Sequence, residues 1–128
     1  MRDLDRWKVS SKTGKGTVCG LPTEIVITEF RNKFFILVTD SGKIGSLVQV
    51  LQETSGSENI CTSRVFFGKD TPEIQAVACA LAETCKFPKP VVFGLSLKNF
   101  SASSVKDLKT LLSVVFEKSS GETEQPCR

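Results

Sequence analysis

The sequence contains no histidine and no tyrosine, and Trp7 is its only tryptophan. Histidine is the commonest general base of enzymes and the commonest transition-metal ligand. Its absence excludes a Ser-His-Asp triad, a Cys-His nucleophile pair and every zinc site that needs an imidazole ligand. The chain is therefore expected to be no enzyme and to hold no metal and no cofactor.

Long apolar runs are also missing from the sequence. No stretch approaches the roughly 18 consecutive apolar residues of a membrane span, and no apolar signal segment precedes the first cysteine. The five cysteines are Cys19, Cys61, Cys79, Cys85 and Cys127, an odd number without a C-x-x-C pair. This usage predicts free thiols in a reducing compartment. We expect a cytoplasmic protein, with the nucleus as an alternative, and no membrane partner.

The formal net charge of the 128-residue chain is +3, and this excess of positive charge lies at one end. The leading segment accounts for all of it, with Arg2, Arg6, Lys8, Lys12 and Lys15 against Asp3 and Asp5. A nucleic-acid-binding domain normally carries cations through its folded part. Residues 1–16 are therefore predicted to be a basic flexible arm, with at most an edge strand over residues 8–17. Residues 17–118 are predicted to form one domain, followed by a polar tail over residues 119–128.

The central part of the chain has the alternation and β-branched residues of strands. Strands are predicted to end near Cys19 and to cover residues 24–30, 34–39, 44–51, 61–67 and 91–97, the first ones in meander order. Helices are predicted from Asp70 or Thr71 to about residue 85, and from Ser103 or Ser104 to Lys118. The fold class is α+β: a mainly antiparallel sheet of five or six strands, open or curled into a sandwich, with two helices in the C-terminal half.

Two features of this pattern indicate a partner. The strand at residues 34–39 is apolar on both faces, and two helices cover only about one face of such a sheet. The first helix carries small residues where a solvated face would carry Lys and Glu. Self-coverage of the sheet and a second subunit both remain open. The predicted interface residues are Phe34, Ile36, Val38, Gly42, Lys43, Ile44, Phe66, Ala76, Cys79 and Ala80.

Three segments in the same order resemble the proteasome assembly chaperone 3 family. They are V-C-G-L-P-T-E-I-V at 18–26, I-L-V-T at 36–39 with G-K-I-G-S-L-V at 42–48, and V-F-F-G-K-D at 65–70 with P-E-I at 72–74. The resemblance implies a non-enzymatic chaperone that orders the α-subunit ring of the 20S proteasome, chiefly by holding the α5 subunit. It also implies pairing with a similar subunit, assembly chaperone 4, or with a second copy of the chain.

The alternative function is a small nucleic-acid-binding module. It would use the cations of the basic arm, with Trp7 and the strand phenylalanines as stacking groups. The neutral body of the chain favours the chaperone, so nucleic acid is not the expected partner.

Overall fold

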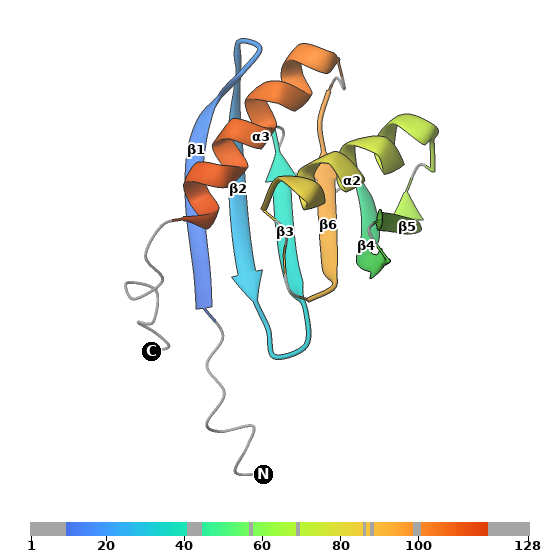
Figure 1. Cartoon of the computed structure of the whole chain (residues 1–128). Coiled ribbons are helices and arrows are strands. Elements are labelled where there is room, and N and C mark those ends of the chain that lie inside the picture. The colour runs from blue at the N-terminus through green and yellow to red at the C-terminus, as the bar shows by residue number, and fades with distance from the viewer. Residues whose placement is uncertain are drawn as a thin grey trace.

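The computed structural model describes residues 10–40, 45–56, 58–68, 70–85, 87, 89–98 and 101–117. These residues form six strands and two helices (Figure 1). The elements are β1 (Ser10–Val18), β2 (Leu21–Glu29), β3 (Phe34–Thr39), β4 (Ser46–Ser55), β5 (Glu58–Gly68), α2 (Pro72–Cys85), β6 (Val91–Ser96) and α3 (Ala102–Phe116). The predicted α+β class, with two helices in the C-terminal half, is confirmed.

The strands form one sheet in the order β1-β2-β3-β6-β4-β5. All neighbours are antiparallel except β3 and β6, which run parallel. The last strand in the sequence thus lies between β3 and β4, so the prediction that β4 closes a meander was wrong. β6 is apolar along almost its whole length, which is typical of a strand in the interior of a sheet with a neighbour on each edge. The strands form a single open sheet, so of the two predicted forms the open sheet is correct and the sandwich is not.

Both helices lie on the same face of this sheet (Figure 1). α3 packs over β1 and β2, and α2 packs over β4 and β5 and touches β6. The hydrophobic core lies between the sheet and this helix layer. Its largest fully buried side chains include Phe93, Ile25, Ile36, Leu81, Leu108 and Leu112.

Side-chain oxygens cap the first turn of each helix. The backbone N–H of Ile74 donates to Thr71 Oγ1 at 3.2 Å, and the N–H of Ser104 donates to Ser101 Oγ at 3.2 Å. Such caps satisfy amides that have no partner within the helix. The predicted start of α2 is therefore confirmed with Thr71 as its cap. α3 begins at Ala102, slightly before its predicted start.

The strand β1 extends across the boundary expected at residue 16. It pairs with β2 from Ser10 to Val18 and forms one edge of the sheet. Contacts with α3 hold it there: the Lys12 ammonium donates to the backbone carbonyl of Phe116, and a Cβ on Gly16 would lie 3.1 Å from Leu111 Cδ1. Residues 1–9 of the predicted arm and the predicted tail at 119–128 lie outside the described residues.

A disulfide joins Cys61 on β5 to Cys79 on α2, with their Cα atoms 6.1 Å apart. The expectation that all five cysteines are free thiols is therefore corrected. Pairing across the sheet-helix boundary depends on tertiary structure, which cysteine spacing does not encode. Next to the disulfide, Ser63 Oγ donates to Gln75 Oε1 at 2.7 Å, so β5 and α2 are linked twice. These links hold the edge strand β5 against α2.

Replacing both bonded cysteines by serine (C61S/C79S) should lower the free energy of unfolding by about 3 kcal/mol without reductant. A closed loop of this length restricts the unfolded chain by about that much. Urea titrations with and without dithiothreitol measure the difference, which should disappear in reductant. Cys19→Ser, which changes an exposed free thiol, is the control and should leave stability unchanged. Equal stability of the double variant and the parent without reductant would contradict the cross-link.

Candidate partner-docking face

The face of the sheet opposite the helices carries an apolar surface. Side chains alternate between the two faces of a strand, and on β3 the helix-side residues Ile36 and Val38 are both 0% exposed. Phe35 and Leu37, which point to the other face, are only half-buried. We define the open face by its apolar residues, which are Val26, Phe35, Leu37, Leu47, Phe66, Phe67 and Val92. Among the described elements, both helices lie on the other side of the sheet (Figure 1).

Gly94 lies at the centre of the open face, on β6. It pairs with Leu37 on β3 and with Leu47 on β4. A Cβ at this position would lie 3.3 Å from Leu37 Cδ1, and 3.6 Å from both Leu47 Cδ2 and Phe35 Cζ. The absence of a side chain on Gly94 therefore lets three large side chains converge over the centre of the sheet. The result is an apolar patch that spans β3, β6 and β4.

A β-bulge extends this patch onto β5. Leu47 pairs with Phe67 and Val48 pairs with Val65, so Phe66 is the extra residue in the β5 strand. Val65 packs against the core on the helix side. A bulge re-aims side chains at the point of insertion, and here both phenylalanines are directed to the open face. They are 52% and 62% exposed, which is unusual for adjacent large apolar residues.

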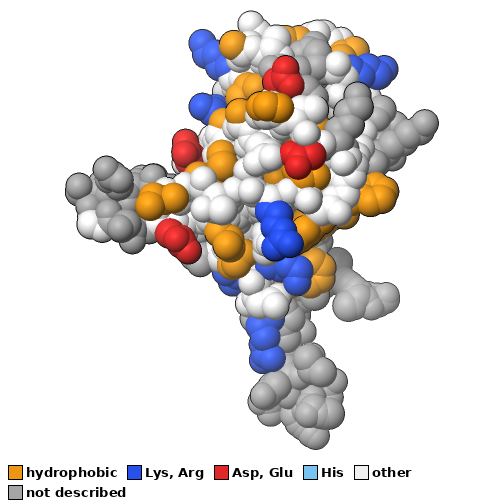
Figure 2. Space-filling view, turned by 90° about the vertical axis from the view of Figure 1, so that its right-hand side faces the viewer, with side chains coloured by type: hydrophobic (Ala, Val, Ile, Leu, Met, Phe, Trp, Pro, Cys, Tyr) orange, Lys and Arg blue, Asp and Glu red, His pale blue; other side chains and the backbone are white. Residues whose placement is uncertain are grey.

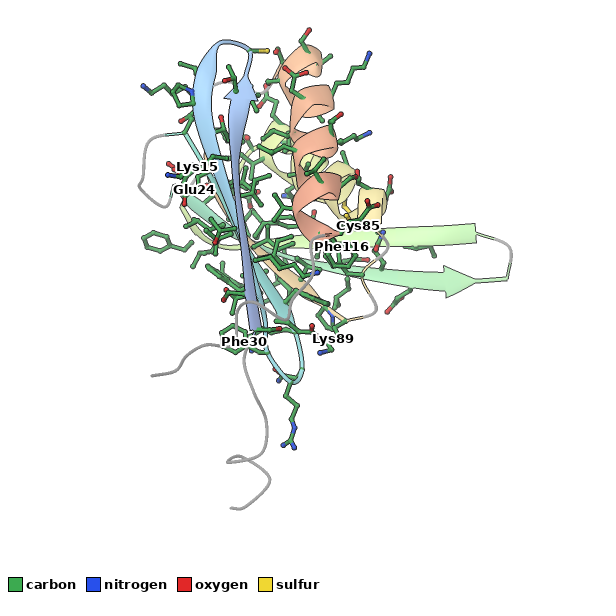
Figure 3. All side chains as sticks on the ribbon, turned by 90° about the vertical axis from the view of Figure 1, so that its left-hand side faces the viewer. Lys15, Glu24, Phe30, Cys85, Lys89 and Phe116 are labelled. Atoms are coloured by element: carbon green, nitrogen blue, oxygen red, sulfur yellow. A yellow bond between two sulfur atoms is a disulfide. The ribbon has the colours of Figure 1, made fainter. Side chains whose placement is uncertain are left out.

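The margins of the open face are polar. On the β1 side, Lys15 pairs with Glu24 of β2, and Figure 3 shows the two residues next to each other. On the β5 side, the Arg64 guanidinium lies 5.7 Å from the centre of the Phe66 ring. Figure 2, viewed from the β5 side, shows hydrophobic side chains reaching the surface between charged ones. An apolar centre with a charged margin is the usual composition of a protein–protein interface.

The described residues offer little for catalysis. They contain no group of three or more Cys, Asp or Glu side chains placed to hold a metal ion. Burial raises the pKa of the Cys85 thiol, and the nearby Glu117 raises it further, against a hydrogen bond with Ser113 and the charge of Lys12. A raised pKa keeps the thiol protonated and therefore a poor nucleophile. No helix in the described part is long and apolar enough to cross a membrane.

The structure divides the predicted interface residues among several places. Phe34, Ile36 and Val38 are at most 5% exposed beneath the helices, so they belong to the core. The accessible apolar surface of β3 is on its other side, on the open face. Phe66 lies on the open face as defined above. Gly42, Lys43 and Ile44 lie outside the described residues.

The remaining predicted residues lie in the helix layer, on the other side of the sheet. Ala76 is exposed and Ala80 is half-buried on α2. Cys79, next to them in the sequence, is bonded to Cys61. The two features predicted to contact a partner therefore do not form one surface, because the whole thickness of the core separates them.

Six residues of the open face were not among the predicted interface residues: Val26, Phe35, Leu37, Leu47, Phe67 and Val92. Part of the signal was in the sequence, because the strand at 34–39 is apolar on both faces. The prediction named the residues of the face that the helices cover. For Phe67, the adjacent pair of phenylalanines was a signal, since alternation would direct one of two neighbours into the core.

The chain matches the family model described as "Proteasome assembly chaperone 3" over residues 36–126. It is similar to proteins named "Proteasome assembly chaperone 3" from Mus musculus, 31% identical over 84% of this chain and 93% of that protein, and from Homo sapiens, 30% identical over 83% and 92%. The Bos taurus protein of that name is 30% identical over 81% of this chain and 90% of its own length.

Among solved structures, the fold is similar to a chain of "a Novel Chaperone Complex for Yeast 20S Proteasome Assembly". The TM-score is 0.61 and the alignment covers 83% of this chain and 98% of that one, at 12% sequence identity. This likeness concerns the fold.

Replacing both exposed rings by serine (F66S/F67S) should reduce the fluorescence of the apolar dye ANS bound to the protein. The free energy of unfolding should change by less than about 1 kcal/mol, because the rings contribute little to the core. Val114→Ser on α3, which removes another exposed apolar side chain, is the control for a single isolated site. A loss of more than about 2 kcal/mol in the double variant would show that the rings pack inside the protein.

Proposed function

The chain belongs to the proteasome assembly chaperone 3 family, and we propose that it is a chaperone that promotes assembly of the α-subunit ring of the 20S proteasome. Members of this family are non-catalytic, and the chain is accordingly no enzyme. The observation that carries the proposal is the family match, which extends over residues 36–126. The relatives named above match this chain along most of their own length, so the comparison involves the whole fold.

The proposal includes a dimer with a similar chaperone subunit, of the assembly chaperone 4 type. The open face supports it, because an apolar patch across four neighbouring strands is costly to leave in water. A second sheet stacked on this face would bury Leu37 and Leu47 as the helices bury the opposite face. The structural neighbour is described as a complex, which fits a paired working form. The proposal includes a second kind of dimer, in which two copies of this chain pair through the same open face.

The client in this proposal is a free α subunit of the 20S particle, chiefly the α5 subunit, and the site of action is the cytoplasm. Holding an unassembled subunit needs complementary surfaces and no reacting group. The polar margin of the open face and the outer surface of the helix layer stay accessible in a dimer joined through the sheet. They are therefore the surfaces available to a client.

Pairing should depend on the open face and not on the helix layer. Phe67→Asp should weaken dimer formation by about tenfold or more, because a carboxylate would be buried without a partner. Val114→Asp is the matched control: this residue on α3 is 56% exposed, against 62% for Phe67. Sedimentation velocity of the chain alone and with the partner subunit measures the dimer. Equal weakening by both variants would contradict pairing through the sheet.

The client is tested by affinity purification of the tagged full-length chain from cells. Free or partly assembled 20S α subunits, with α5 the most enriched, should be recovered. Recovery of mature 20S particles only, or of no proteasome subunit, would refute the chaperone function. Salt-sensitive recovery of nucleic acid in their place would favour the alternative module.

A further inference from the structure

A groove of about 430 Å³ runs between α2 and α3 on the outer side of the helix layer. On α2 it is lined by Glu73, Ala76, Val77 and Ala80, and on α3 by Ala102, Val105, Lys106 and Lys109. Each wall therefore uses the spacing i, i+3, i+4 and i+7, which is one continuous stripe of a helix. The groove is open to solvent, because Ala76 and Ala102 are exposed.

The floor of the groove consists of short apolar side chains. Ala76 and Ala80 occupy positions where a solvated helix normally carries long charged residues. Short side chains on facing helices allow the backbone of a third element to approach closely. The volume is also within the range of clefts that hold a few apolar side chains of a ligand. The groove therefore has the shape of a docking site for an apolar ridge.

The charge of the two walls is unequal. The α3 wall carries Lys106 and Lys109, both exposed and within one turn of each other. Neither lysine forms an ion pair with a described residue. The α2 wall carries Glu73 alone, in the first turn, where a carboxylate is stabilised by the helix dipole. The groove is thus apolar along α2 and positively charged along α3.

The lining also restricts the secondary structure of an occupant. Backbone groups of α2 and α3 in the middle of each helix are paired within the helix. An extended peptide in the groove would therefore find few partners for its own N–H and C=O groups. A helix satisfies these groups internally and can lie with its apolar stripe on Ala76 and Ala80.

We propose that this groove binds an amphipathic helix of a partner protein, with acidic residues one turn apart facing Lys106 and Lys109. The two lysines are separated by a rise of about 4.5 Å along α3, which matches carboxylates at i and i+3 of a helix alongside. This is the helix-in-groove mode of recognition, with charge fixing the orientation. The groove lies on the side of the sheet opposite the open face, so both surfaces can be occupied together. The inference does not depend on the proposed function.

The probe is a synthetic amphipathic helix of about 16 residues with an alanine and leucine stripe flanked by glutamates one turn apart. A second peptide has lysine in place of each glutamate. The glutamate peptide should bind the full-length protein at least about tenfold more tightly in fluorescence anisotropy, and salt should weaken it. Amide shifts in ¹⁵N NMR spectra should be largest around Ala76, Ala80 and Lys109.

Ala76→Arg fills the groove from an exposed position and should reduce binding about tenfold or more. Thr110→Arg, at an exposed position of α3 outside the groove, is the matched control and should bind as the parent does. K106E/K109E should reverse the preference between the two peptides, and it tests the proposal even if Ala76→Arg does not fold. Equal affinity for both peptides, no binding of either, or shifts confined to the open face would overturn the proposal.

Discussion

The structure depends on the position of β6 between β3 and β4. On the helix side, Phe93 of β6 pairs with Ile36 and with Val48, and all three side chains are 0% exposed. On the open side, Gly94 allows Leu37 and Leu47 to meet above it. One strand therefore joins the two halves of the sheet on both faces. Removing apolar character from β6 would separate the β1–β3 meander from the β4–β5 hairpin.

The placement of the two helices explains why the sheet has one covered and one open face. Both helices follow strands at the end of the chain and return over the same side of the sheet (Figure 1). Three phenylalanines close the core where α3 ends, with centroid distances of 5.0 Å between Phe34 and Phe87 and 4.8 Å between Phe87 and Phe116. Figure 3 shows Phe116 and Cys85 close together in this region. The other face receives no such cover from the described elements, and it is the face to which we assign the proposed partner subunit.

Local signals made part of this fold predictable from the sequence. The cap at Thr71 and the apolar spacing that follows it depend on residues within α2, so that helix was predicted almost to the residue. The place of β6 was not predictable in the same way, because strand order depends on which edges remain free after the other strands pair. For the site, a strand that is apolar on both sides indicates two buried faces but does not say which one the helices cover. The side on which the helices lie decides that Phe34 is buried in the core and that its neighbour Phe35 lies on the open face.

The parallel pairing of β3 with β6 also affects how the chain folds during synthesis. β1, β2 and β3 pair with their neighbours in sequence and can form as soon as they leave the ribosome. The β4–β5 hairpin can form alone, but it joins the sheet only when residues 91–96 become available. Until then β3 and β4 each have a free apolar edge, and such edges favour intermolecular pairing. The newly made chain therefore passes through a stage in which it is itself prone to aggregate, and that stage ends when β6 is inserted.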